Sequence, residues 1–326
     1  MPDVFLTGGS GFVGGALLRG LAADGREVRA LARSSAGEER VRALGGRPVP
    51  GDLWDASALR RGMAGCRVVF HAAGVNAMCL PDPSAMYRAN VEGPVEVVRA
   101  AAACGIRRVV HTSSAVTAGE AAGTMATEQT PHRGSYLSHY ERSKHLGEQA
   151  VLAEGNRLGV EVVCVNPASV QGPGRTGGTA RILIGYLNGR LRWAVNATLS
   201  LVFVDDCTRG HLLAELRGRP GERYLLSGAT LTVREALEVL GSVVGHERTV
   251  RFLPRWATSA GATVAGGAWR LAGRPAPVCR EMARVMRHGA AYDGSRATRD
   301  LGLAYTPLED WLRATVEWYR EQRLAG

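Results

Sequence analysis

Short apolar runs recur along the first half of the chain, and each is followed by a longer stretch whose apolar residues return every three to four positions. Runs of this length suit buried strands, whereas the longer repeat is typical of amphipathic helices. Because strand and helix alternate up to Pro167, we expect an α/β fold with a Rossmann-type, doubly wound parallel sheet and helices on both faces. The expected strands are Val4–Leu6, Glu27–Ala32, Arg47–Pro50, Val68–Phe70, Val109–Thr112 and Val160–Val165.

The alternation ends after Pro167, and the rest of the chain predicts a different organisation. A strand within Leu201–Asp206, a helix to Arg217 and a strand at Tyr224–Leu226 would complete the dinucleotide-binding domain. Residues Thr232 and Glu235 form a capping-box pattern, which predicts a helix running to Val244. We therefore expect a Rossmann domain of residues 1–167 plus about 198–228, and a smaller, mainly helical substrate lobe of about 168–197 plus 229–326.

The first strand leads directly into a glycine-rich turn that opens a helix, at Thr7 to Gly14. Glycines permit a tight turn and a close approach of the backbone, and a helix N-terminus offers free N–H groups to a pyrophosphate. This arrangement predicts a dinucleotide site whose residues include Gly8, Ser10, Gly11, Phe12, Val13 and Gly14.

The end of the second strand bears on which dinucleotide is bound. An acidic residue there commonly holds the ribose 2′-hydroxyl of NAD, whereas a basic residue can accommodate the 2′-phosphate of NADP. The chain has Arg33 followed by Ser34 at this place. We therefore favour NADP(H) as the cofactor, with NAD(H) as the alternative if Arg33 is an ordinary surface arginine.

Tyr140 and Lys144 are four residues apart in a stretch that predicts a helix, so they lie on one face. Lys144 is the only lysine among the chain's 40 basic residues, and arginine occupies every other basic position. A lysine can sit beside a phenol and depress its pKa, which an arginine fork does less readily. The pair is a candidate acid/base centre, and an ordinary surface pair is the alternative.

The remaining composition narrows the class of protein. The net charge is +10, yet the arginines are spread along all 326 residues without charge blocks, so we expect no nucleic-acid partner. The six cysteines are widely spaced and form no C-x-x-C pair, which argues against disulfides and a metal site and suits a reducing cytoplasm. No membrane span is expected, and Trp256–Ala272 is interpreted as a packed helix.

Taken together, the motifs resemble those of the extended short-chain dehydrogenase/reductases, the NAD-dependent epimerase/dehydratase family. The resemblance covers about residues 3 to 230 and is nearest to the dihydroflavonol-reductase-like branch, which also includes hopanoid-associated sugar epimerases. The matching motifs are T-G-x-x-G-x-x-G at Thr7–Gly14, Asp52-Leu53, His71-Ala72-Ala73, Asn90-Val91-x-Gly93, Thr112–Ala115, Tyr140-x-x-Ser143-Lys144, Pro167 with Gly172-Pro173, and Val204–Asp206.

The resemblance implies a hydride-transfer site. Tyr140 would act as general acid/base, Lys144 would lower its pKa and hold the nicotinamide ribose, and Ser114 would bind the carbonyl oxygen. Asn90 would support a water relay. Further cofactor contacts are implied at Asp52, Leu53, Ala72, Ala73, Gly74, Thr112, Pro167, Ala168 and Val170. The substrate pocket would draw on the segments 75–86, 117–138 and 175–193.

Departures from related branches favour reduction of a small organic molecule over other chemistry. Ala115 and Val116 occupy the places where sugar-nucleotide dehydratases carry Asp and Glu. The expected function is an NADP(H)-dependent ketoreductase or secondary-alcohol dehydrogenase, with a homodimer as a possible assembly. A sugar or nucleotide-sugar epimerase with tightly bound NAD(P), and a dinucleotide-binding regulator without catalysis, are the alternatives.

Overall fold

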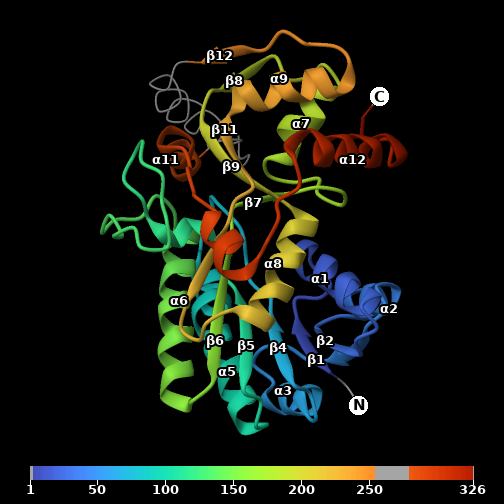
Figure 1. The fold of residues 1–326 in the computed structure, drawn as a ribbon, viewed down its shortest axis with the longest axis vertical. Coiled ribbons are helices and arrows are strands. Elements are labelled where there is room, and N and C mark those ends of the chain that lie inside the picture. Colours follow the sequence, from blue (N-terminus) through green and yellow to red (C-terminus); the bar gives the residue numbers. More distant parts are fainter. Residues whose placement is uncertain (1–2, 254–278, 326) are drawn as a thin grey trace.

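The computed structural model describes residues 3–253 and 279–325. Its larger domain is built on a seven-stranded parallel sheet (Figure 1). The strand order is β10-β6-β5-β4-β1-β2-β3, so the chain reverses its direction of travel across the sheet between β1 and β4. Ligands of such sheets bind at the carboxyl ends of the strands near this switch point. The strands are β1 (Val4–Thr7), β2 (Val28–Ala32), β3 (Arg47–Pro50), β4 (Val68–His71), β5 (Arg108–Thr112), β6 (Glu161–Pro167) and β10 (Arg223–Leu226).

Helices cover both faces of the sheet, as the hydrophobic pattern predicted. On one face Leu17, Leu18 and Leu21 of α1 are completely buried together with Cys207 of α8. On the other face α3, α5 and α6 pack through residues such as Leu59 and Val97. The helices of this domain are α1 (Phe12–Ala23), α2 (Ser35–Ala43), α3 (Ala56–Met63), α4 (Ser84–Tyr87), α5 (Gly93–Ala103), α6 (His139–Leu158) and α8 (Val204–Arg217).

The smaller lobe lies above the carboxyl end of the sheet in Figure 1 and contains strands as well as helices. Its own core includes Leu240 of α9 and Tyr319 of α12, both with no exposed surface. The expected helix at Trp256–Ala272 lies outside the described residues. The elements of this lobe are β7 (Ser169–Gln171), α7 (Ala180–Leu187), β8 (Trp193–Val195), β9 (Thr198–Phe203), β11 (Ala229–Thr232), α9 (Val233–Val244), β12 (Arg251–Leu253), α11 (Arg280–His288) and α12 (Leu308–Glu321).

Several local predictions can be compared directly with the structure. The capping box is present, because the Thr232 hydroxyl accepts from the Glu235 N–H and the Glu235 carboxylate accepts from the Thr232 N–H. The strand expected within Leu201–Asp206 ends at Phe203 and pairs with β7 and β11 instead of joining the seven-stranded sheet, and α8 begins at Val204. Its two aspartates therefore lie in the first helical turn, where negative charge is favourable. The domain boundaries themselves stay a prediction.

The expectation that the cysteines remain unpaired is wrong. Cys79 and Cys279 form a disulfide across 200 residues of sequence, with their Cα atoms 5.9 Å apart. The prediction failed because the spacing of cysteines along the sequence does not indicate which segments the fold brings together. Since the argument for a reducing compartment rested on unpaired cysteines, a cytoplasmic location stays a prediction. In the part of the chain that the structure describes, no helix is long and apolar enough to cross a membrane.

Candidate active site

The glycine turn between β1 and α1 brings the backbone of two segments into close contact. Gly8 has φ = 77°, and a Cβ on it would lie 2.6 Å from the carbonyl carbon of Ala72. A Cβ on Gly14 would lie 2.1 Å from the Gly8 oxygen. No side chain caps α1 at Gly11, so the first N–H groups of this helix remain available. The turn therefore fits a dinucleotide pyrophosphate, which needs bare backbone and free donors.

The carboxyl end of β2 presents a cation and two hydroxyl groups. Arg33 is exposed directly after β2, and Ser34 caps α2 by accepting from the Gly37 N–H at 3.2 Å. A Cβ on Gly37 would lie 3.3 Å from the Ser34 Oγ and 3.8 Å from the Ser10 Oγ. The Ser10 and Ser34 hydroxyls thus lie beside the first turn of α2, and Arg33 directly precedes Ser34, as a binding surface for a ribose phosphate would require.

Asp52 and Leu53 lie in the loop after β3, and neither of them caps a helix. The Asp52 carboxylate accepts from the Trp54 N–H at 2.8 Å, whereas Asp55 caps α3 by accepting from the Ala58 N–H at 2.9 Å. Leu53 packs toward Gly93 at the start of α5. Asp52 is therefore not the N-cap of α3.

Asn90 is buried in a short π-helical segment between α4 and α5, with an exposed fraction of 2%. Its amide nitrogen donates to the Val75 carbonyl and to the Ser143 hydroxyl, both at 2.9 Å, and its oxygen accepts from the Val75 N–H at 2.8 Å. These bonds fix the loop after β4 against α6. A water relay through Asn90 stays a prediction.

Tyr140, Ser114 and Lys144 come together where β5 meets the first turns of α6. Ser138 begins this helix by accepting from the Glu141 N–H at 3.0 Å, so Tyr140 and Lys144 fall on consecutive turns. Burial raises the pKa of the Tyr140 phenol, and a hydrogen bond with Ser114 and the charge of Arg175 oppose this rise. The site thus contains a phenol whose ionisation is set by contacts within the pocket.

Lys144 is 6% exposed, and its ammonium donates to the Thr112 carbonyl at 2.9 Å. Burial lowers the pKa of Lys144 to about 8, although the nearby Glu148 opposes the effect. Of the two cations near Tyr140, it is Arg175 that lowers the phenol pKa in this structure. The predicted lowering of the phenol pKa by Lys144 is not seen in this structure. The Lys144 ammonium instead bonds the carbonyl of Thr112 at the end of β5.

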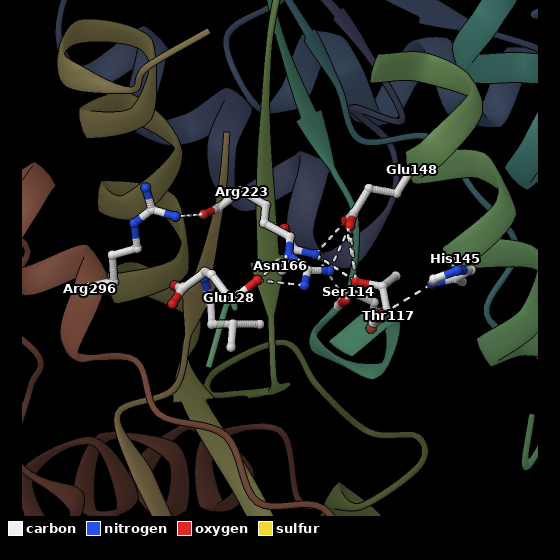
Figure 2. Close-up of polar contacts among 9 residues, drawn as sticks. Ser114, Thr117, Glu128, His145, Glu148, Asn166, Arg223 and Arg296 are labelled. Atoms are coloured by element: carbon white, nitrogen blue, oxygen red, sulfur yellow. Dashed lines mark hydrogen bonds and ion pairs between the residues drawn. The ribbon is translucent and has the colours of Figure 1, made fainter. Parts of the chain in front are cut away.

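A buried polar network lies behind Ser114 and holds the 3-10 turn Ala115–Ala118 that follows it (Figure 2). The Thr117 hydroxyl donates to the Ser114 carbonyl at 2.9 Å, and the Asn166 amide donates to the Thr117 hydroxyl at 2.8 Å. Arg223 of β10 pairs with Glu148 of α6 at 3.3 Å. Strands β6 and β10, the turn and α6 thereby fix the orientation of Ser114 relative to Tyr140.

Two stacked histidines lie in adjacent strands within the electrostatic reach of Lys144. The His71 and His111 rings are 5.2 Å apart between centroids, and the Thr7 hydroxyl bonds the His71 ring at 2.7 Å. Burial and, secondarily, the Lys144 charge lower the pKa of His71 to about 3. Burial also lowers the pKa of His211, which bonds Thr112, to about 4. These imidazoles are neutral structural groups.

The glycine turn, the ends of β4 and β5 and the first turns of α6 border one pocket of about 500 Å³. It is lined by most of the predicted site residues, whereas Gly8, Ser10, Arg33, Ser34, Asp52 and Leu53 lie outside its lining. The predicted residues that line it are Gly11, Phe12, Val13, Gly14, Ala72, Ala73, Gly74, Asn90, Thr112, Ser114, Tyr140, Lys144, Pro167, Ala168 and Val170.

The rest of the pocket wall comes from loops and from the smaller lobe. The sequence predicts pocket segments at 75–86, 117–138 and 175–193, and Met78, Glu120 and Arg175 line the pocket from them. Nothing in the sequence points to 199–200 or 285–292. Val285 and Tyr292 reach the pocket because the disulfide and a β-bridge between Ala126 and Tyr292 bring distant segments together.

Comparison with known proteins agrees with this geometry. The chain is 32% identical over 325 residues to a putative dihydroflavonol 4-reductase of Synechocystis, covering 97% of this chain and 94% of that protein. It is 34% identical over 306 residues to 4-hydroxy-2-methyl-3-oxo-4-farnesyl-3,4-dihydroquinoline-1-oxide ketoreductase of Stigmatella aurantiaca, covering 92% and 91%. The crystal structure of gox2253 superposes over both complete chains with a TM-score of 0.86 and 28% identity.

The NAD dependent epimerase/dehydratase family model matches residues 4–227, which include the glycine turn, Ser114, Tyr140 and Lys144. That span is well over half of the chain and ends at the close of the seven-stranded sheet. The protein therefore belongs to the NAD-dependent epimerase/dehydratase family of extended short-chain dehydrogenases/reductases, and it is an NAD(P)-dependent enzyme.

Proposed function

We propose that this protein is an NADP(H)-dependent ketoreductase, which interconverts a ketone and a secondary alcohol of a small organic molecule. The observation that carries the proposal is that Tyr140, Ser114 and Lys144 line one pocket together with the glycine turn, where burial raises the pKa of the phenol and the Ser114 side chain and the Arg175 charge lower it. A bound nicotinamide would supply hydride to the carbonyl carbon, or accept it in the reverse direction. The protein must then supply one proton to the carbonyl oxygen and stabilise the charge that develops there.

Tyr140 is the proton donor in the direction of reduction. Its phenol is protonated at neutral pH, because burial raises its pKa, and it transfers that proton to the oxygen as the carbonyl carbon is reduced. Ser114 donates a second hydrogen bond to the same oxygen and is held for this by the network of Thr117 and Asn166. Lys144, fixed at Thr112, would bind ribose hydroxyls and return a proton to Tyr140.

The preference for NADP(H) rests on the carboxyl end of β2. Arg33 is exposed there without an ion-pair partner among the described residues, and the Ser34 and Ser10 hydroxyls lie beside Gly37 in the first turn of α2. A guanidinium with flanking hydroxyls suits a phosphate, whereas no carboxylate directly follows β2 to hold a ribose 2′-hydroxyl.

Arg33→Ala tests the cofactor preference in calorimetric titrations with both dinucleotides. We expect NADPH affinity to fall about tenfold or more, because a charge-assisted contact is lost, with little change for NADH. The exposed Arg40 of α2 supplies a matched control, Arg40→Ala. Unchanged NADPH affinity in Arg33→Ala would remove the cofactor part of the proposal.

The reductase assignment is supported by the similar proteins and by the serine turn. Both relatives described above are named as reductases, and one acts on a 3-oxo compound by its name. In this chain Ala115 and Val116 follow Ser114, so the turn offers no acid or base for elimination of water.

A screen of ketones monitored by NADPH absorbance tests the assignment, with Tyr140→Phe as the inactive variant. We expect turnover by the wild-type protein and a loss of about 100-fold or more in the variant, whose phenyl ring cannot supply the proton. NADPH binding should be retained in Tyr140→Phe. Equal turnover by both proteins would contradict the role of Tyr140.

A further inference from the structure

The unoccupied polar groups of the pocket can all donate hydrogen bonds. Three buried side-chain atoms that line it have no hydrogen-bond partner within residues 3–253 and 279–325, namely the Ser113 Oγ, the Arg133 Nε and the Arg175 Nε. A hydroxyl can donate or accept, whereas a guanidinium only donates. Because a buried polar group without a protein partner must find one in the ligand or in water, these atoms indicate a bound molecule that presents acceptors.

The acidic side chains of the pocket are already engaged within the protein. The Arg133 guanidinium donates to the Glu141 carboxylate and, at 3.1 Å, to the Glu120 carbonyl. The Glu120 carboxylate lies 3.4 Å from the His288 ring nitrogen. Neither acid pairs with Arg175 in the part of the chain that the structure describes. Of the two arginines that line the pocket, Arg175 is thus the one whose charge no described carboxylate balances.

Arg175 is held in the loop after β7 by its backbone. Its N–H donates to the Gly172 carbonyl at 3.1 Å, and its carbonyl accepts from the Tyr319 hydroxyl of α12 at 3.0 Å. Its guanidinium carbon lies 5.4 Å from the centroid of the Phe12 ring, and its Nη2 would lie 3.3 Å from a Cβ on Gly178. No hydrogen bond or ion pair joins this guanidinium to the described residues. The loop therefore fixes a cation at the pocket wall and leaves its N–H groups to a ligand.

An unbalanced guanidinium in a pocket wall favours an anionic ligand. Its planar fork of N–H groups matches the two oxygens of a carboxylate, and such hydrogen bonds are strengthened by charge. A single unbalanced arginine suits the single negative charge of a carboxylate better than a phosphate, which carries nearly two charges. Val116, Leu137, Leu199 and Val285 make much of the remaining wall apolar, which suits the hydrocarbon part of an organic acid.

The pyrophosphate of the dinucleotide is the other anion that this pocket would contain. Phe12 begins α1 at the glycine turn, so Arg175 lies near the place of both ligands. The pyrophosphate is already provided with the uncapped N–H groups of α1, and Lys144 is held at the Thr112 carbonyl. The charge of Arg175 also lowers the pKa of the Tyr140 phenol, in agreement with a position near the reacting carbonyl. These observations favour the substrate as the source of the anion.

We propose that Arg175 binds a carboxylate of the substrate, so that the enzyme reduces oxo acids in preference to the corresponding esters. The inference rests on the proposed ketoreductase function and names its substrate class. Arg175 is then a specificity-determining residue, while Tyr140 and Ser114 serve the reacting carbonyl. A site that pairs with a carboxylate discriminates against the neutral ester, because the ester leaves the guanidinium without its partner.

Levulinate, 5-oxohexanoate and 7-oxooctanoate, each compared with its methyl ester, test the proposal with NADPH oxidation as the readout. These acids place the carboxylate at different distances from the ketone. In the wild-type protein we expect kcat/KM for at least one acid to exceed that of its ester about tenfold or more, mainly through KM. In Arg175→Met the ratio of acid to ester should fall to about one, whereas Arg175→Lys should keep part of the preference.

The ratio isolates binding of the carboxylate from the effect of Arg175 on Tyr140, because acid and ester use the same phenol. Arg181→Met, at an exposed position of α7 outside the pocket lining, is the control and should keep the wild-type ratio. The proposal is overturned if the wild-type protein treats every acid and its ester alike, or if Arg175→Met keeps the preference for the acid.

Calorimetric titrations separate the two sources of the anion and the two proposals. The corresponding hydroxy acids should bind the NADPH complex, in which no hydride can be transferred, more tightly than their methyl esters, and Arg175→Met should lose this difference. A fall of about tenfold in NADPH affinity, with the acid preference retained, would assign Arg175 to the pyrophosphate and overturn the proposal. Binding of hydroxy acids that depends on Arg175, without NADPH oxidation by any ketone, would keep the carboxylate site and reject the ketoreductase function.

Discussion

The two sides of the pocket are built in different ways. The cofactor side comes from consecutive strand–turn–helix units of one sheet, and its contacts are largely between backbones, such as Gly8 against Ala72. The substrate side is assembled from segments far apart in the sequence. The Cys79–Cys279 disulfide joins the loop after β4 to α11, and Glu281 of α11 accepts from the N–H groups of Cys79 and His139.

This difference implies that residue types on the cofactor side are fixed by the fold, whereas residue types on the substrate side can vary. Backbone contacts at the glycine turn tolerate no added side chain, so the cofactor side depends on a few fixed residue types. The substrate side depends on the side chains that its loops and α11 bring to the wall, Glu120 and Tyr292 among them. The same sheet can therefore support many substrates through changes confined to that side.

The largest effect is expected from an added methyl group on the cofactor side. Gly14→Ala would place a Cβ about 2.1 Å from the Gly8 oxygen, and the turn must shift out of its pyrophosphate-binding shape. We expect NADPH affinity to fall about 1,000-fold, or about 4 kcal/mol, in calorimetric titrations. Gly177→Ala is the control on the substrate side, where a Cβ meets nothing within 4 Å. If circular dichroism shows that Gly14→Ala is folded, NADPH affinity equal to that of the wild-type protein would contradict the dependence of the cofactor side on backbone contacts.

Loss of the disulfide should affect the substrate side selectively. In a variant with Cys79→Ser and Cys279→Ser, α11 is no longer tied covalently to the loop after β4. We expect a loss of about 2–4 kcal/mol in the free energy of unfolding and a severalfold rise in KM for the ketone. NADPH affinity should be unchanged, and Cys104→Ser serves as the control at a free cysteine. Weaker NADPH binding together with an unchanged KM would reverse the assignment of the two sides.

Acid should weaken the sheet below the cofactor side through its buried histidines. The folded-state pKa of His71 is about 3, below its unfolded value of 6.5, so the unfolded chain binds more protons between these values. Stability is therefore complete above about pH 6.5 and falls as the pH decreases, by up to about 1.4 kcal/mol per pH unit for this residue. Urea unfolding at pH 7 and pH 5 should show a smaller decrease for His71→Asn than for the wild-type protein. Equal decreases would exclude a contribution from His71.

The smallest effect concerns Arg175, which belongs to the substrate side but acts on Tyr140. Its charge lowers the pKa of the phenol, so Arg175→Met should raise that pKa. Alcohol oxidation needs the phenolate, and its pH–rate profile should move toward alkaline pH, with less than about a tenfold loss of rate at neutral pH. Arg181→Met, at an exposed position of α7, should leave the profile in place. A profile that does not move in Arg175→Met would assign no electrostatic role to this residue.

Sequence reasoning succeeded where structure is determined locally. The glycine turn, the helix that carries Tyr140 and Lys144, and the capping box at Thr232 follow from periodicity and short-range hydrogen bonding, and the structure contains each of them. The family resemblance also implied pocket segments at 75–86, 117–138 and 175–193, and residues of each line the pocket.

The substrate side escaped prediction because its contacts have no local pattern. Nothing near Tyr292 indicates that it pairs with Ala126, and a lone pair of cysteines 200 residues apart carries no spacing signal. Burial, which the residue type does not reveal, also raises the pKa of Glu120 to about 7. Such properties depend on the packed structure and are visible only there.

Transfer of deuterium from C4 of the nicotinamide is the most direct test of the proposed function. Wild-type protein would be incubated with NADPH carrying deuterium at the transferred C4 position and with a ketone from the screen, and the product analysed by mass spectrometry. The account predicts one deuterium on the secondary alcohol for each NADPH oxidised, and no labelled alcohol with Tyr140→Phe. Ketone recovered without label and without oxidation of NADPH would contradict it, and inversion of a secondary alcohol without net reduction of the cofactor would identify an epimerase.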